Sequence, residues 1–293
     1  MINKEIIHSK WKEFKLSLYL LNRNALTRIS IIVLLLIIVC AFLAPVLAPY
    51  PEDAISATHP ELALQAPCIE HLFGTDELGR DILSKTVYGI RISLSSALIT
   101  VIFAMAIGTL LGAIAGALGG IVDEVIMRIT DVFLSFPSLL LAIVIASFLG
   151  PSLRNAQISM IISWWPWYTR IMRGEAIAIR EQPYVKAADT IGTPKWITIL
   201  KHIIPNGMSP IIIQASMDMG AVVLTVASLG FLGLGAQPPT PEWGLMVSTS
   251  KSYFMNAWWY TVFPGLAIFI TVLVFNIIGD GLREVMDPKT RKI

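Results

Sequence analysis

The chain has 293 residues, of which 55% are hydrophobic and only 14% are charged, and its mean hydropathy is +0.70. A soluble domain carries about 25% charged residues, so the surplus apolar surface of this chain must face something other than water. This composition excludes an ordinary cytosolic enzyme, a secreted disulfide scaffold and a disordered chain. The formal net charge of +2 says little by itself.

Six segments are apolar enough to cross a membrane as helices. They fall in these intervals between charged or polar boundaries: Arg28 to Glu52, Arg91 to Asp123, Asp131 to Arg154, Arg154 to Arg170, His202 to Pro241, and Lys251 to Asp280. The fourth interval holds only 15 residues, so its flanking arginines would have to snorkel. Strand-like alternation is absent from these runs. We therefore predict an all-α polytopic membrane protein with six transmembrane helices.

The distribution of basic residues predicts the orientation of these helices. With the N-terminus inside, the four inner segments hold 17 of the 22 Lys and Arg residues, and basic loops stay in the cytoplasm. Both termini are therefore expected to be cytoplasmic. The predicted organisation is an N-terminal segment 1–28, a peripheral helix 29–48 that acts as an uncleaved signal anchor, an extracytoplasmic loop 49–92, a five-helix core 93–281 with a cytoplasmic loop 173–206, and a cytoplasmic tail 282–293.

Two outer loops carry charged and aromatic residues of interest. Asp76, Arg80 and Asp81 head a short helix in the first loop, and Glu242 and Trp243 lie in the second loop. Two interpretations stay open for both groups. They could form a platform on which a substrate-binding protein docks, or they could belong to an elbow on the outer leaflet with a local Arg–Asp pair.

Two features within the membrane segments, a glycine repeat and an acidic residue, each allow a structural and a functional interpretation. Gly108, Gly112 and Gly116 repeat every four residues, a pattern that favours close helix packing over pore lining. Asp218 lies about ten residues into the fifth helix, where an ionised carboxylate is costly and should face the bundle interior or water. It either lines the translocation path and meets a cationic group of the substrate, or makes a structural hydrogen bond.

The cytoplasmic loop 173–206 contains two short predicted helices. Pro183 opens the first helix and Gly192 closes it, Thr193 is the expected N-cap of the second, and Pro205 ends it. The spacing i, i+4, i+7 gives each helix one apolar face, which holds Tyr184, Ala188 and Ile191 in the first helix and Trp196, Leu200 and Ile203 in the second. Helices of seven or eight residues are unstable alone in water. They need a partner, which is either the inner leaflet or another protein.

The run Lys186-Ala187-Ala188, with Gly192 four residues later and Pro205 beyond it, resembles the Glu-Ala-Ala signature of ABC importer permeases. Lys186 departs from the glutamate of that signature and reverses a charge. Three other stretches, 73–81, 119–137 and 231–244, resemble motifs of the subgroup that carries dipeptides, oligopeptides and nickel, in the same order along the chain.

The resemblance implies a type I ABC importer permease fold in the cell membrane and a non-catalytic role. By this resemblance, one set of loop residues would couple the permease to partner ATPases: Tyr184, Val185, Lys186, Ala187, Ala188, Asp189, Gly192 and Pro205. The implied partners are a second homologous permease in a heterodimer, two ABC ATPase subunits, an extracytoplasmic substrate-binding protein and membrane lipid, with no nucleic acid. ATP and Mg would bind the partner ATPases, and no cofactor or metal would bind this chain.

Two other classes of function are less well supported by the sequence. A stand-alone secondary transporter would carry inverted repeats or a chain of intramembrane ionisable residues, and only Asp218 is of that kind. A membrane hydrolase would need a catalytic motif, and the sequence has no P-loop, no His-Glu-x-x-His and no Gly-x-Ser-x-Gly. The expected substrate is a dipeptide or oligopeptide, with nickel or a metal–chelator complex as the alternative.

Overall fold

The computed structural model describes residues 24–286, and within them the chain is helical and contains no strands. The longer helices are α2 (Ala25–Phe42), α4 (Ile82–Leu118), α5 (Gly120–Leu134), α6 (Ser138–Leu149), α7 (Leu153–Arg180), α10 (Ile204–Phe231) and α12 (Trp258–Met286). The short ones are α3 (Ala44–Leu47), α8 (Pro183–Thr190), α9 (Lys195–Thr198), α11 (Trp243–Ser250), the 3-10 turns 51–54, 60–62 and 251–253, and a π-helical turn at Ile199–Ile203.

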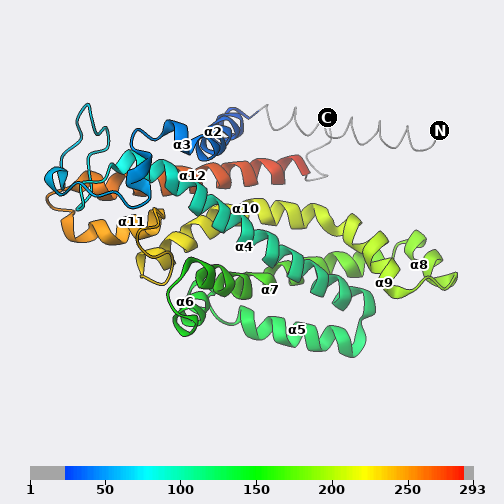
Figure 1. Ribbon diagram of the computed structural model, residues 1–293. Helices are drawn as coiled ribbons and strands as arrows, with labels where there is room; N and C mark the ends of the chain where they lie inside the picture. The colour runs from blue at the N-terminus through cyan, green and yellow to red at the C-terminus, as the bar shows by residue number, and fades with distance from the viewer. Residues whose placement is uncertain (1–23, 287–293) are drawn as a thin grey trace.

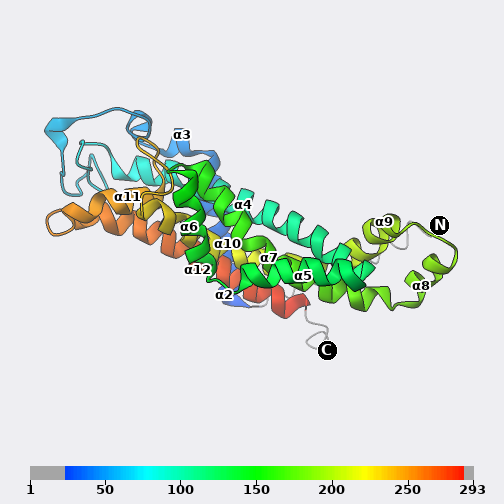
Figure 2. The ribbon, with the colours of Figure 1, turned by 90° about the horizontal axis from the view of Figure 1, so that it is seen from below.

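The long helices form an elongated bundle, and short helices and loops lie at its two ends. Helix α4 packs along α7, α10 packs against α12 and α4, and α2 lies on α12 and α4. Figures 1 and 2 show α8 and α9 at one end of the bundle, and α11 with the loop of residues 49–81 at the opposite end. We call these the α8 end and the α11 end.

The predicted all-α membrane architecture is confirmed, but the count of six straight spans is not. Within residues 24–286, four helical runs are long and apolar enough to cross a membrane: α2, α4, the run Lys195–Phe231 and α12. A fifth candidate is the pair α5 and α6, which is bent by 88°. Helix α7, which contains the fourth predicted span, is not among these candidates.

The third predicted span, between Asp131 and Arg154, is wrong as a single helix. Its first residues end α5, and its second half is the 12-residue helix α6. Pro137 stands at the break and is the N-cap of α6, because proline cannot continue the preceding helix. Helix α4 begins at Ile82, within the predicted loop 49–92.

The glycines of α4 allow α7 to pack against it at very short range. A Cβ atom on Gly112 would stand 2.4 Å from the carbonyl oxygen of Thr169, and one on Gly108 would stand 2.3 Å from that of Trp165. Backbone atoms of α7 cannot move aside as a flexible side chain can. The interpretation of these glycines as a packing face is confirmed.

This packing predicts the effect of adding one methyl group. Gly112→Ala should destabilise the protein by about 1–3 kcal/mol, because the methyl group would overlap the α7 backbone. Gly174→Ala on α7 is the matched control, since nothing lies within 4 Å of its added Cβ, and it should be neutral or stabilising by up to about 1 kcal/mol. Thermal unfolding of the purified proteins in detergent measures both. Equal midpoints for the two variants would contradict the packing account.

Candidate functional site

Helix α8 is defined by the residues that begin and end it. Pro183 occupies its first turn, as the sequence predicts. At the other end, the Thr193 N–H donates to the Ala188 carbonyl and the Gly192 N–H donates to the Asp189 carbonyl, both at 3.0 Å. This pair of bonds is a Schellman motif, which needs a left-handed residue after the helix. Gly192 supplies it with φ +79°.

Two predictions for the second short helix are wrong. Pro194, not Thr193, is the N-cap residue of α9, and it makes no side-chain capping bond. Pro205 does not end the helix, since it lies in the first turn of α10, directly after the π-helical turn Ile199–Ile203. A π turn widens the helix and shifts its hydrogen bonds, so the chain continues through the proline instead of stopping.

The α8 end exposes a group of large apolar side chains. Within the loop, Val185 and Ala188 are buried, as are Ile199 and Ile203. Four large apolar side chains of the same loop are exposed, and we call them the α8 tip: Tyr184, Ile191, Trp196 and Leu200. Ile191 is 82% exposed and Trp196 is 64% exposed. Apolar residues gathered on a protruding loop are typical of a surface that binds a partner.

The charged residues beside the α8 tip are paired within the loop. The Lys186 Nζ lies 2.8 Å from a carboxylate oxygen of Glu181, and the Lys195 Nζ lies 2.7 Å from one of Asp189. The hydrogen bond from Lys186 lowers the pKa of the Glu181 carboxyl below its ordinary value. The positive charge of Lys186, which departs from the family signature, is therefore balanced inside this chain.

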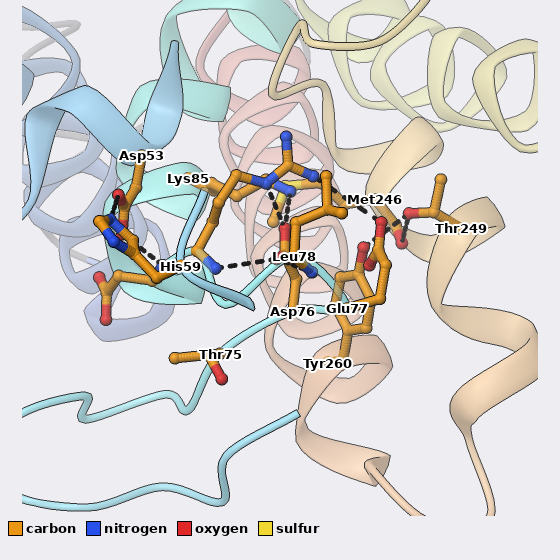
Figure 3. Close-up of polar contacts among 12 residues, drawn as sticks. Asp53, His59, Thr75, Asp76, Glu77, Leu78, Lys85, Met246, Thr249 and Tyr260 are labelled. Carbon is orange, nitrogen blue, oxygen red and sulfur yellow. Dashed lines mark hydrogen bonds and ion pairs between the residues drawn. The ribbon is translucent and has the colours of Figure 1, made fainter. Parts of the chain in front are cut away.

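At the α11 end, Asp76 is the centre of a buried ionic cluster (Figure 3). Its Oδ2 lies 2.7 Å from the Arg80 Nε and 2.5 Å from the Lys85 Nζ. Its Oδ1 accepts hydrogen bonds from the backbone N–H groups of Leu78 and Arg80. Burial alone would raise the pKa of the Asp76 carboxyl, but Lys85 and Arg80 outweigh burial and hold the pKa below its ordinary value.

A second polar network ties the outer loop to the start of α4. Asp81 is the N-cap of α4 and accepts from the Ser84 N–H at 2.7 Å. Its other oxygen lies 3.0 Å from the His71 Nδ1, and its backbone N–H donates to Asp53 at 2.8 Å. Asp53, His71 and Lys85 could not be predicted as members of these networks, because the contacts join residues up to 28 positions apart and leave no local pattern.

Glu242 and Trp243 hold α11 against the rest of the α11 end. Glu242 is the N-cap of α11 and accepts from the N–H groups of Gly244 and Leu245, each at 2.9 Å. Burial raises the pKa of its carboxyl. The Trp243 indole N–H donates to the Thr86 carbonyl on α4 at 3.0 Å.

The five residues predicted to dock a binding protein are therefore all internal. Asp76, Arg80, Asp81, Glu242 and Trp243 are buried, and they join the loop, α4 and α11 into one body. Arg80 also lines a cavity of about 480 Å³, together with Glu77 and residues from α11 and from the 238–240 turn.

Asp218 lies in the middle of α10 and is buried inside the bundle. Its Oδ1 accepts a hydrogen bond from the Gln214 amide at 2.9 Å. The Tyr168 hydroxyl of α7 lies close to the carboxylate, but neither that hydroxyl nor the Asp218 Oδ2 completes a regular hydrogen bond with a described residue. The structure thus places a buried carboxylate between α7 and α10, bonded to Gln214 and next to the Tyr168 hydroxyl.

These features define a class of protein: a polytopic helical membrane protein whose α8–α9 loop lies at one end of the bundle, with no strands among its described residues. Residues 108–292 match the family described as binding-protein-dependent transport system inner membrane component. Residues 11–67 match the N-terminal TM domain of oligopeptide transport permease C. The chain belongs to the family of inner membrane components of binding-protein-dependent transport systems, and it is a permease subunit of an ABC importer.

Several curated relatives are similar over nearly their whole length. The probable D,D-dipeptide transport system permease protein DdpC of Escherichia coli K12 is 43% identical over 92% of this chain and 90% of its own. The dipeptide transport system permease protein DppC of Alkalihalophilus pseudofirmus is 44% identical over 97% and 91%. The glutathione transport system permease protein GsiD of Pectobacterium atrosepticum is 39% identical over 99% and 95%.

One solved structure confirms the type of fold. A chain of the inward-facing MetNI methionine ABC transporter matches with a TM-score of 0.56 and 18% identity, over 70% of this chain and 98% of its own. At this identity the similarity concerns the fold alone. It agrees with the type I importer fold that the sequence predicts.

Proposed function

We propose that this permease forms half of a peptide pathway and that its α8 tip docks onto an ATPase subunit. A second, homologous permease would complete the pathway as a heterodimer, and two ATPase subunits would bind ATP and Mg. This chain would carry no cofactor and no catalytic residue. The single observation that carries the proposal is the exposed apolar α8 tip, on the loop that holds the family signature.

The geometry of the loop supports coupling to the membrane helices. Helix α8 follows α7 after two residues, and the run from Lys195 to Phe231 passes through the π-helical turn into α10. A displacement of α8 would therefore act on α7 and α10 together. These are the helices that enclose Asp218 and Tyr168, so ATPase closure at the α8 tip could change the interior of the bundle.

The proposed orientation puts the α8 end in the cytoplasm. Of the 22 basic residues, 17 fall in segments assigned to that side, and such an excess is typical of cytoplasmic loops. The α11 end would then face outward. A substrate-binding protein would dock there, on the surface supported by the buried Asp76 cluster and by Glu242 and Trp243.

The relatives support a peptide as the substrate. They are named for dipeptides and for glutathione, which are small and carry both an ammonium and carboxylate groups. Asp218 would meet a cationic group of such a substrate when α7 and α10 separate. The nickel alternative has no comparable support among these relatives.

The role of Asp218 gives a testable result. Asp218→Asn should lower the initial rate of dipeptide uptake about tenfold, because it removes a charge-assisted contact of about 1.4 kcal/mol. An asparagine keeps the acceptor for Gln214, so the amount of protein in the membrane should not change. Uptake into cells, normalised to the protein level by immunoblot, measures both. Unchanged uptake would leave Asp218 a purely structural residue.

Cross-linking tests the docking of the α8 tip. In a chain with Cys40 and Cys68 replaced by serine, Ile191→Cys should form a cross-link to an ATPase subunit through a reagent that carries a maleimide for the new thiol and a photoreactive benzophenone for the partner. Ile69→Cys is the matched control, since Ile69 is a similarly exposed isoleucine, at 95%, in the loop of the α11 end. Cross-linking to the ATPase at residue 69 and not at residue 191 would refute the proposal.

A further inference from the structure

A cavity of about 500 Å³ lies between α2, α4, α10 and α12, far from the α8 tip. Its walls on α2 include Leu34, Ile38 and Ala41, and its walls on α4 include Leu94 and Leu98. These spacings of three and four residues place each set along one face of its helix. The cavity is therefore an apolar groove that runs along the two helices, and its volume lies in the range of ligand pockets.

Arg91 is the one charged residue that lines this cavity. Its side chain is exposed, and no carboxylate of residues 24–286 forms an ion pair with it. Arg80 and Lys85, which precede Arg91 in the chain, are both paired with Asp76. Arg91 thus carries an uncompensated charge at the start of an apolar stretch of α4, where an unpaired guanidinium is costly.

Three observations together point to one kind of ligand. The groove is apolar, it borders α2, whose outer surface exposes many large apolar side chains, and it has a free arginine at one place along α4. Arg91 and Leu98 are seven residues apart, so the groove extends about 10 Å along α4 from the arginine. An acyl chain fits the apolar part, and a phosphate fits the guanidinium, which binds phosphate oxygens in pairs.

We propose that this cavity is a phospholipid site, in which Arg91 binds the phosphate and the groove between α2 and α4 holds an acyl chain. The lipid would belong to the leaflet at the α11 end, because Arg91 lies near that end of α4 and Phe42, the last residue of α2, borders the same cavity. It would fasten the peripheral helix α2 to the core. This proposal does not depend on the transported substrate.

The test uses the complete transporter with the full chain, purified in detergent and examined by native mass spectrometry. Three probes separate the contributions of the phosphate and of the acyl chains. Phosphatidylglycerol has both, diacylglycerol has acyl chains alone, and inorganic phosphate has no acyl chain. The variants are Arg91→Gln, which removes the charge, and Ala41→Trp, which fills the groove and keeps Arg91. Arg154→Gln is the control, since Arg154 is also exposed but does not line this cavity.

Phosphatidylglycerol should be retained by the wild type and by Arg154→Gln, and its retention should fall about tenfold in Arg91→Gln, as expected for a charge-assisted contact. Ala41→Trp should lower it as well. Diacylglycerol should be retained less than phosphatidylglycerol by the wild type. Equal phosphatidylglycerol retention by Arg91→Gln would overturn the proposal. Retention of inorganic phosphate in place of the lipid would also overturn it.

Discussion

Replacing Ala188 by leucine and Gly192 by valine in one chain should abolish peptide uptake without preventing assembly of the protein in the membrane. Gly192 has φ +79°, and a residue with a Cβ there costs about 1–2 kcal/mol, most of all a β-branched one. The Schellman motif that ends α8 would be lost. Ala188 is buried against the rest of the loop, so leucine would push α8 away from the position it needs against an ATPase.

The control for this variant is Gly150→Val. Gly150 also has a positive φ, +88°, and nothing lies within 4 Å of its added Cβ, but it ends α6 and not α8. Gly150→Val matches the backbone strain of Gly192→Val at a position outside the α8 loop, and it leaves out the packing change that Ala188→Leu adds. Uptake of a labelled dipeptide and the ATPase activity of the purified transporter should both be measured. Uptake near the wild-type rate in the double variant would refute the coupling role of α8.

Replacing Asp76 by alanine should cause the largest loss of stability. The Arg80 and Lys85 cations would then stay buried without their carboxylate, and breaking a buried ion pair in this way costs about 3–5 kcal/mol. Glu124→Ala is the matched control, because both side chains of the Glu124–Arg128 pair are exposed. Such a pair should contribute about 0–1 kcal/mol to the free energy of unfolding. Thermal midpoints in detergent measure the difference. Equal midpoints for the two variants would contradict the structural role of the cluster.

The same cluster predicts a dependence of stability on pH. The pKa of the folded-state Asp76 carboxyl is lowered by Lys85 and Arg80. A lowered folded-state pKa stabilises the protein above the unfolded pKa of about 4, and this stabilisation is lost as the pH falls through the folded value. The thermal midpoint of the wild type should therefore fall at acid pH, and Asp76→Asn should remove this part of the fall.

The comparison of sequence and structure shows which features have local causes. Pro183 and Gly192 act on their own neighbours, so the bounds of α8 follow from the sequence. The glycine face of α4 follows from its spacing of four residues. The helix break at Pro137 could have been expected from that proline, but the uncharged interval around it suggested one span.

The features that could not be predicted depend on tertiary contacts. Pro205 lies in the first turn of α10, directly after a π-helical turn. No sequence pattern in residues 199–203 predicts that turn. The burial of Trp243 depends on a distant segment, since its indole N–H donates to the Thr86 carbonyl, and the buried Asp76 pairs with Lys85 on the first turn of α4, beyond the reach of a local helix pattern. Charged residues in a loop look exposed from sequence alone, and here they form the inside of the α11 end.

The proposed function requires that this chain import peptides only as part of an ATP-driven complex. The most direct measurement is dipeptide accumulation in proteoliposomes that hold the complete transporter, with the binding protein outside and ATP inside. We expect accumulation that requires both ATP and the binding protein, and that falls to background with the Ala188→Leu, Gly192→Val chain. Dipeptide flux driven by an ion gradient through this chain alone, without ATP or partners, would contradict the claim.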